Sequence, residues 1–128
     1  MRSFNLETIN DGDVQILEVS GYMGSDECHR VEKELQQMLG QKHRRVILDC
    51  GTLTFITTAS LARLMACAKQ FHQHEGHVTL AGLSASASRL AEMVGFDRKT
   101  ELLPSTEAAR RLLSRVTSSA PRDRGKTK

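Results

Sequence analysis

The sequence predicts one α/β domain, with a mixed sheet of about five strands and about four helices. Two strand-like stretches separated by a turn cluster open the chain, which is typical of an antiparallel hairpin. Helix-like and strand-like patterns then alternate, which implies right-handed crossovers and mainly parallel pairing. A length of 128 residues is enough for one hydrophobic core.

The hairpin is predicted to join residues 3–9 to residues 14–20. Between them lies Asn-Asp-Gly-Asp, and Asp-Gly favours a tight hairpin turn. In the second strand Val14 and Ile16 alternate with Leu17 and Val19, so neither face is cleanly polar. We therefore expect this strand to be covered on much of its surface.

The first helix is expected over residues 25–39, with Ser25 as its cap and Gly40 closing it. The apolar run at residues 46–48 predicts a buried central strand. Residues 52–56 are expected to continue as a loop or short extended segment.

The remaining elements follow from helical spacing, capping residues and turn residues. They are a helix from about residue 58 to about residue 76, a strand at 77–82, a short helix capped by Ser84 or Ser86 and ended by Gly95, a weak strand at 100–103, and a helix from residues 104–105 to residue 116. Residues 1–116 thus form the domain, and residues 117–128 are expected to be a disordered basic tail.

The formal charge of +3 is located in that tail. Residues 122–128 hold four Lys/Arg and one Asp, so the rest of the chain is neutral. A nucleic-acid-binding domain would need a basic face within the fold, and none is predicted. No apolar run is long enough for a membrane span or a secretory signal, so we expect a cytoplasmic protein without membrane insertion.

No pattern of catalytic, cofactor-binding or metal-binding residues stands out, and the protein is predicted not to be an enzyme. Residues 72 and 74 are both His, but positions two apart on a helix point roughly 160° away from each other. Cys28, Cys50 and Cys67 form no Cys-x-x-Cys pair and are expected to be buried, reduced and metal-free.

The stretch FITTASLARL, residues 55–64, is the strongest candidate for function. It runs from a strand to a helix N-terminus, where unsatisfied NH groups favour negative charge. Thr57 or Thr58 can cap this helix, or one of them can carry a phosphate there. The residues alone leave both readings open.

The chain resembles the STAS domain family of bacterial anti-sigma-factor antagonists over about residues 4–116. The segment VSGYMGSDECHRVEKEL is similar to the family's strand, Gly-x-Leu-Asp segment and first helix. The segment RRVILDCGTLTFITTASLARLMACAKQFHQHEGHVTLAGLSASASRLAEMVGF is similar to its phosphorylation loop and the surrounding elements. The resemblance implies a STAS fold.

It also implies a function. Members of the family capture a serine/threonine kinase that serves as an anti-sigma factor, phosphorylation of the loop hydroxyl breaks that complex, and a phosphatase resets it. The resemblance places the phosphoacceptor at Thr58, or less favourably at Thr57, where the usual loop has Asp. The implied partner-binding residues are Gly24, Thr57, Thr58, Ala59, Ser60 and Arg63.

Four of these positions depart from the family's pattern. Thr57 replaces Asp, Ala59 replaces a frequent second Ser, and Ser60 replaces Gly. Gly24 stands where the Gly-x-Leu-Asp segment usually ends in Asp. The alternative is therefore a constitutive STAS interaction module, in a signalling complex or beside a membrane transporter, that binds without phosphorylation. A ligand-binding STAS domain is a third option.

Overall fold

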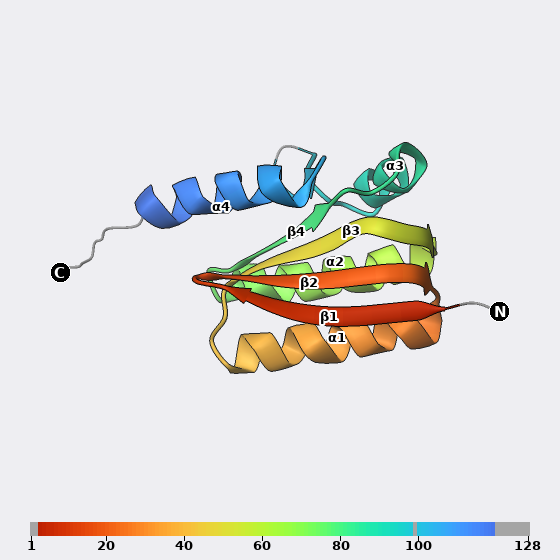
Figure 1. The fold of residues 1–128 in the computed structure, drawn as a ribbon, viewed down its shortest axis with the longest axis horizontal. Helices are drawn as coiled ribbons and strands as arrows, with labels where there is room; N and C mark the ends of the chain where they lie inside the picture. The colour runs from red at the N-terminus through yellow and green to blue at the C-terminus, as the bar shows by residue number, and fades with distance from the viewer. Residues whose placement is uncertain (1–2, 99, 120–128) are drawn as a thin grey trace.

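The computed structural model describes residues 3–98 and 100–119, which form a five-stranded sheet with four helices (Figure 1). The strands are β1 (Phe4–Asp11), β2 (Val14–Met23), β3 (Arg45–Ile56), β4 (His77–Ala81) and β5 (Leu102–Leu103). The helices are α1 (Ser25–Gly40), α2 (Thr58–Gln73), α3 (Ala85–Met93) and α4 (Thr106–Ser119). The predicted mixed α/β class is confirmed.

The sheet has the strand order β1-β2-β3-β4-β5. β1 and β2 pair antiparallel around a turn at Gly12, whose φ of 64° suits a residue without Cβ. The pairs β2–β3, β3–β4 and β4–β5 are all parallel, as helical crossovers require. The hairpin and the parallel crossovers predicted from the sequence are both present.

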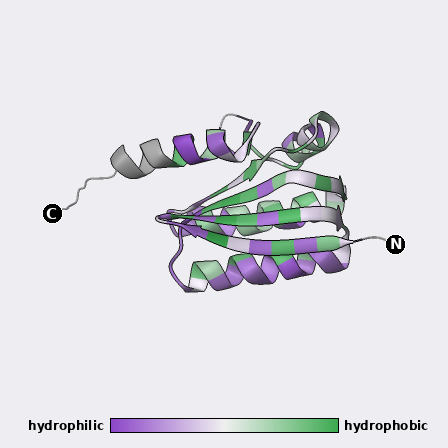
Figure 2. Ribbon diagram, in the orientation of Figure 1, coloured by the Kyte–Doolittle hydropathy of each residue, from purple (hydrophilic) through white to green (hydrophobic). Residues whose placement is uncertain are grey.

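Two apolar layers form because the first parts of β2 and β3 are buried on both faces. Figure 2 shows the hydrophobic residues along these two strands. Leu17 and Leu48 face the larger cluster, which α1 and α2 cover together. Ile16 and Ile47 face a smaller cluster, to which α4 contributes Leu113. Successive strand residues point to opposite faces, so near-continuous apolar runs place the two strands at the centre of the sheet.

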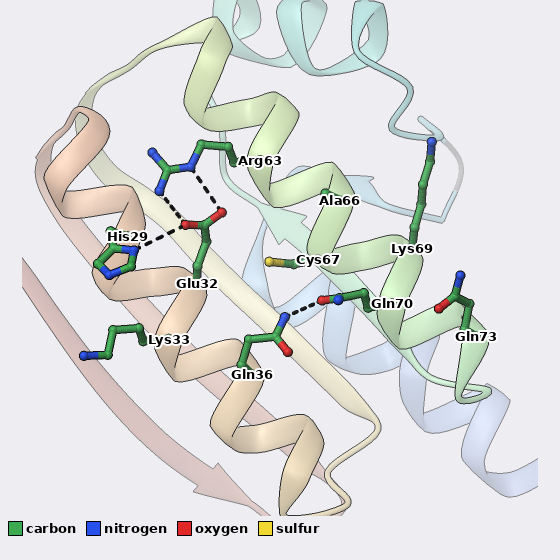
Figure 3. Close-up of a pocket in the computed structure, with 10 residues that line it drawn as sticks. All are labelled: His29, Glu32, Lys33, Gln36, Arg63, Ala66, Cys67, Lys69, Gln70 and Gln73. Atoms are coloured by element: carbon green, nitrogen blue, oxygen red, sulfur yellow. Dashed lines mark hydrogen bonds and ion pairs between the residues drawn. The ribbon is translucent and has the colours of Figure 1, made fainter.

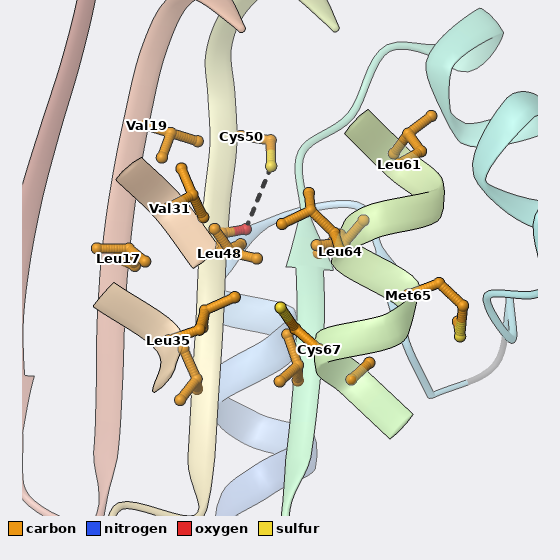
Figure 4. Packing of buried hydrophobic residues seen from close by; sticks show 14 of the residues in the cluster. Leu17, Val19, Val31, Leu35, Leu48, Cys50, Leu61, Leu64, Met65 and Cys67 are labelled. Atoms are coloured by element: carbon orange, nitrogen blue, oxygen red, sulfur yellow. Dashed lines mark hydrogen bonds between the residues drawn. The ribbon is translucent and has the colours of Figure 1, made fainter. Parts of the chain in front are cut away.

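The larger cluster fixes the positions of α1 and α2 (Figure 4). Val31 and Leu35 of α1 and Leu61 and Leu64 of α2 are fully buried against the sheet. Burial of each such side chain contributes about 1.5–3 kcal/mol relative to exposure. The orientation of the first turn of each helix therefore depends on apolar side chains elsewhere in the same helix.

Residues 52–56 form the extended segment that was one of the two predicted alternatives. β3 continues to Ile56 beside β2, which continues to Met23, with register irregularities near Glu18 and Gly21. Two other boundaries need correction. The helix predicted to end near residue 76 ends at Gln73, and the weak strand shortens to residues 102–103.

The caps also differ in part from the prediction. Gly24, and not Ser25, is the N-cap of α1, and its NH donates to Glu27 Oε1 at 3.0 Å. Ser84, one of the two predicted candidates, caps α3 by accepting from the NH of Ala87. Helix α4 continues to Ser119, so residues 117–119, which were predicted to belong to the tail, are helical. Residues 120–128 of that tail lie outside the described residues.

Among the helices described, none is both long enough and apolar enough to cross a bilayer.

Candidate functional site

The candidate site lies where α1 and α2 begin, at the carboxyl ends of β2 and β3. Met23 and Ile56 are register partners at the end of the β2–β3 ladder. The chain leaves both strands at this point, so Gly24 and Thr57 open the two helices at the same edge of the sheet. Functional groups of α/β proteins commonly gather at this edge.

Hydroxyl groups tie the two helix starts together. Thr57 Oγ1 accepts a hydrogen bond from the NH of Ser60 at 3.0 Å and donates to Ser60 Oγ at 2.8 Å. Ser60 Oγ in turn donates to the carbonyl oxygen of Gly24 at 3.3 Å. Only 1% of Ser60 is exposed. The hydroxyl of Thr57 is therefore the cap of α2, and both its donor and an acceptor lone pair are in use.

Thr58 differs from Thr57 in both access and bonding. It is the first residue of α2, it is exposed, and its hydroxyl makes no hydrogen bond to a described residue. The first intrahelical bond runs from the NH of Leu61 to the carbonyl of Thr57, so the NH groups of Thr58 and Ala59 precede it. The first turn of α2 has no acidic residue to offset the partial positive charge there. The structure thus separates the capping threonine from the available one.

The predicted partner-binding residues all lie at this junction but differ in access. Thr58 and Ala59 are exposed, Thr57 and Arg63 are half-buried, and Gly24 and Ser60 are buried. Only the exposed pair can offer a whole side chain to another molecule. The other four hold the junction together.

Gly24 is close to a tyrosine ring, which explains the absence of a side chain there. A Cβ at this position would lie 2.8 Å from Cε2 of Tyr22 and 3.3 Å from Glu27 Oε1. Any larger residue, including Asp, would have to displace the tyrosine ring.

Arg63 connects the two helices on the side of this junction. Its guanidinium donates to both carboxylate oxygens of Glu32, with the Nε–Oε2 distance at 3.1 Å. Nη1 also donates to the carbonyl oxygen and to Oγ of Ser25, each at 3.2 Å. Hydrogen bonds from Arg63 hold the pKa of the Glu32 carboxyl below its usual range. Sequence reasoning did not identify this ion pair, because its partners are on different helices.

Two aromatic rings lie near the threonines and were also missed. Tyr22 and Phe55 stack with centroids 4.9 Å apart and planes within 6°. Phe55 is nevertheless 48% exposed, and beside it a cavity of ≈ 220 Å³ is lined by Leu83, Leu90 and neighbouring residues. The two rings are register partners on β2 and β3. This stack was not predicted, because residues 52–56 were expected as a loop or short extended segment and no strand partner was assigned to them.

His72, His74 and the three cysteines are engaged in contacts or buried within the domain. His72 Nε2 lies 3.3 Å from Glu101 Oε2, and His74 Nδ1 lies 3.0 Å from the carbonyl oxygen of Gln70. Within residues 3–98 and 100–119, no group of three or more His, Cys, Asp or Glu side chains could hold a metal. The three free cysteines are buried, as predicted, and burial raises the pKa of the Cys50 thiol to about 12.

Comparison with known proteins identifies relatives over most of the chain. A family model described as "Mlab, STAS domain" matches residues 8–104. A candidate anti-sigma factor antagonist of Bordetella bronchiseptica, BtrV, is 32% identical over 91 residues, covering 71% of this chain and 78% of that protein.

Solved structures share the fold at lower identity. An anti-sigma factor antagonist from Mycobacterium paratuberculosis superposes with a TM-score of 0.77 at 16% identity, covering 88% of this chain and 95% of that one. The Bacillus cell-fate determinant SpoIIAA, in its phosphorylated form, superposes with a TM-score of 0.68 at 14% identity, covering 89% and 99%. These likenesses support the five-stranded architecture with helices on both faces.

Proposed function

The chain belongs to the STAS domain family, and from this premise we propose that it is a regulatory binding protein of the anti-sigma-factor-antagonist type. It captures a serine/threonine kinase that also acts as an anti-sigma factor, using the surface around Thr58. Phosphorylation of Thr58 ends the complex, and a phosphatase restores the binding form. The protein acts in the cytoplasm and has no enzymatic activity of its own.

The observation that carries this proposal is the division of roles between the two threonines. The hydroxyl of Thr58 is exposed and free of hydrogen bonds to described residues, whereas that of Thr57 is occupied on both sides. A kinase can reach Thr58 Oγ1 and transfer the γ-phosphoryl group of ATP to it. The hydroxyl proton then passes to a base of the kinase, and ADP leaves. The same reaction at Thr57 would remove the cap of α2.

The start of α2 tolerates the added charge. A phosphate brings about −1.5 to −2 charges at neutral pH. The first turn of α2 has free NH groups and no acidic residue, so the helix dipole stabilises that charge by about 0.3–1 kcal/mol. The fold therefore accommodates a phosphorylated Thr58. The added charge destabilises the complex with the partner and not the domain itself.

The partner meets a surface that combines Thr58 with apolar groups. Phe55, about half exposed and backed by Tyr22, lies just before the threonines. Aromatic side chains are enriched in the centres of protein interfaces because they bury large apolar areas. A phosphate on Thr58 would need to be desolvated inside such a contact, which weakens binding.

A second function is favoured by the residue at position 57. The usual family loop has a carboxylate before the acceptor, and here Thr57 is a cap instead. If kinase recognition requires that carboxylate, the domain is a constitutive interaction module, in a signalling complex or beside a membrane transporter. Its surface would be the same, but Thr58 would carry no phosphate.

Variants of Thr58 test the proposal directly. The wild-type chain is used as bait in extracts of its native cell, and the captured kinase is then purified for affinity measurements. Thr58→Glu is expected to weaken kinase binding at least about tenfold, because a charge must be buried in the contact. Thr58→Ala is expected to bind like wild type and to stay bound when ATP is added. Thr8→Glu, which places the same charge on exposed strand β1, is the matched control.

The results separate the two functions. If Thr58→Glu and Thr8→Glu both bind like wild type and ATP releases nothing, the switch is wrong and the constitutive module remains. If the captured partner is not a kinase at all, the anti-sigma-factor assignment fails as well.

A further inference from the structure

An open groove, lined mainly by charged and amide-bearing residues, runs between the outer faces of α1 and α2 (Figure 3). It has a volume of ≈ 800 Å³ and is bordered on one side by His29, Lys33 and Gln36 of α1. Lys69 and Gln70 of α2 are on the other side. The groove lies along the helices, so it is a different surface from the exposed first turn of α2.

The groove has an excess of positive charge. Lys33 and Lys69 are exposed, lie on opposite helices, and form no ion pair with a described residue. Among the residues that line the groove, the one carboxylate is that of Glu32, and Arg63 already binds both of its oxygens. The two lysine ammonium groups can therefore form ion pairs with negatively charged groups of another molecule.

The floor of the groove offers hydrogen bonds of the peptide type. Gln36 Nε2 donates to Gln70 Oε1 across the groove. With this bond in place, the carbonyl oxygen of Gln36 and the NH₂ group of Gln70 make no hydrogen bond to another described residue, whereas the Gln36 side chain also hydrogen-bonds with the Cys67 thiol. Gln73 adds a third amide, while Ala66 and Cys67 leave room because their side chains are small. Unpaired amide groups in a groove match the CO and NH groups of another polypeptide.

We propose that this groove binds an acidic peptide segment of a partner protein. Asp or Glu side chains of the segment pair with Lys33 and Lys69, and its backbone meets the glutamine amides. A nucleic acid fits less well, because none of the groove's lining residues is Phe, Tyr or Trp and bases would have no ring to stack on. The contact does not use Thr58, so it adds a second anchoring point beyond the proposed switch.

The test is an NMR titration of the full chain with a short polyglutamate peptide as probe. The side-chain amide signals of Gln36, Gln70 and Gln73 are expected to shift in a saturable way. Double reversal, Lys33→Glu with Lys69→Glu, is expected to weaken binding by about twofold to thirtyfold, as the loss of two exposed ion pairs implies. The control Lys42→Glu changes a lysine outside the groove and is expected to leave the affinity unchanged.

Other outcomes overturn the proposal. Absence of shifts in the groove amides, or an equal loss of affinity in Lys42→Glu, would mean that polyglutamate has no specific site here. A single-stranded oligonucleotide of equal charge that shifts the same signals more strongly would identify phosphate, and not a peptide, as the ligand. Thr58→Ala, run in parallel, is expected to titrate like wild type, so failure of the switch leaves this result unaffected.

Discussion

Removal of the hydroxyl at position 57 is expected to destabilise the domain, whereas its removal at position 58 is not. Thr57→Ala deletes the cap that accepts from the NH of Ser60 and the donor that reaches Ser60 Oγ. Loss of a threonine cap costs about 0.5–2 kcal/mol, and the buried Ser60 also loses a partner. We therefore expect a decrease of about 1–2 kcal/mol in the free energy of unfolding. For a domain of this size, that is about 4–8 °C in Tm.

Urea denaturation of the wild type and three variants measures this difference. Thr58→Ala removes a hydroxyl without a described partner and is expected to stay within about 0.5 kcal/mol of wild type. Thr57→Ser keeps the hydroxyl and is expected to retain most of the stability. If Thr57→Ala and Thr58→Ala unfold at the same urea concentration, the division of roles between the two threonines is wrong.

Three further outcomes follow from the packing and the pKa shifts. Because Arg63 lowers the pKa of Glu32 in the folded state, their pair stabilises the domain above the ordinary pKa of about 4.5. That contribution is lost as pH falls through the folded-state value, so the Tm gap between wild type and Glu32→Gln should close in acid. Gly21→Ala should cost more than about 2 kcal/mol, because φ is 86° and a Cβ would lie 2.1 Å from a backbone oxygen. Gly12→Ala, with φ 64° and open space around it, should cost only about 1 kcal/mol in the same denaturation assay. The thiol of Cys50, with a pKa raised to about 12, should react with a disulfide reagent at pH 8 only after unfolding, and rapid reaction in the native protein would contradict its burial.

The fold was predictable because the strongest sequence patterns coincide with the most buried elements. Val46 and Leu48 lie in an apolar run, and β3 is a central strand covered on both faces. The extension of β3 to Ile56 was not predictable from residues 52–56 themselves. They have mixed polarity, and they become a strand because β2 extends beside them. Pairing between distant segments determined that boundary.

The sequence predicted the position of the candidate site, but not which of its two threonines caps the helix. Thr57 and Thr58 are identical in type and adjacent, so only the backbone geometry of the helix start distinguishes the cap from the free hydroxyl. The contact from Ser60 to Gly24 joins residues far apart in the chain, and so does the stack of Tyr22 on Phe55. Such contacts depend on the strand register, which no local pattern in this sequence specifies.

Regulation by phosphorylation of Thr58 can be tested by mass spectrometry of the protein from its native cell, separated into free and partner-bound pools. The peptide containing residues 46–63 is analysed in each pool. We expect phosphate on Thr58 in the free pool and none in the bound pool. Phosphate on Thr57, equal phosphorylation of Thr58 in both pools, or no phosphate in either pool would contradict it.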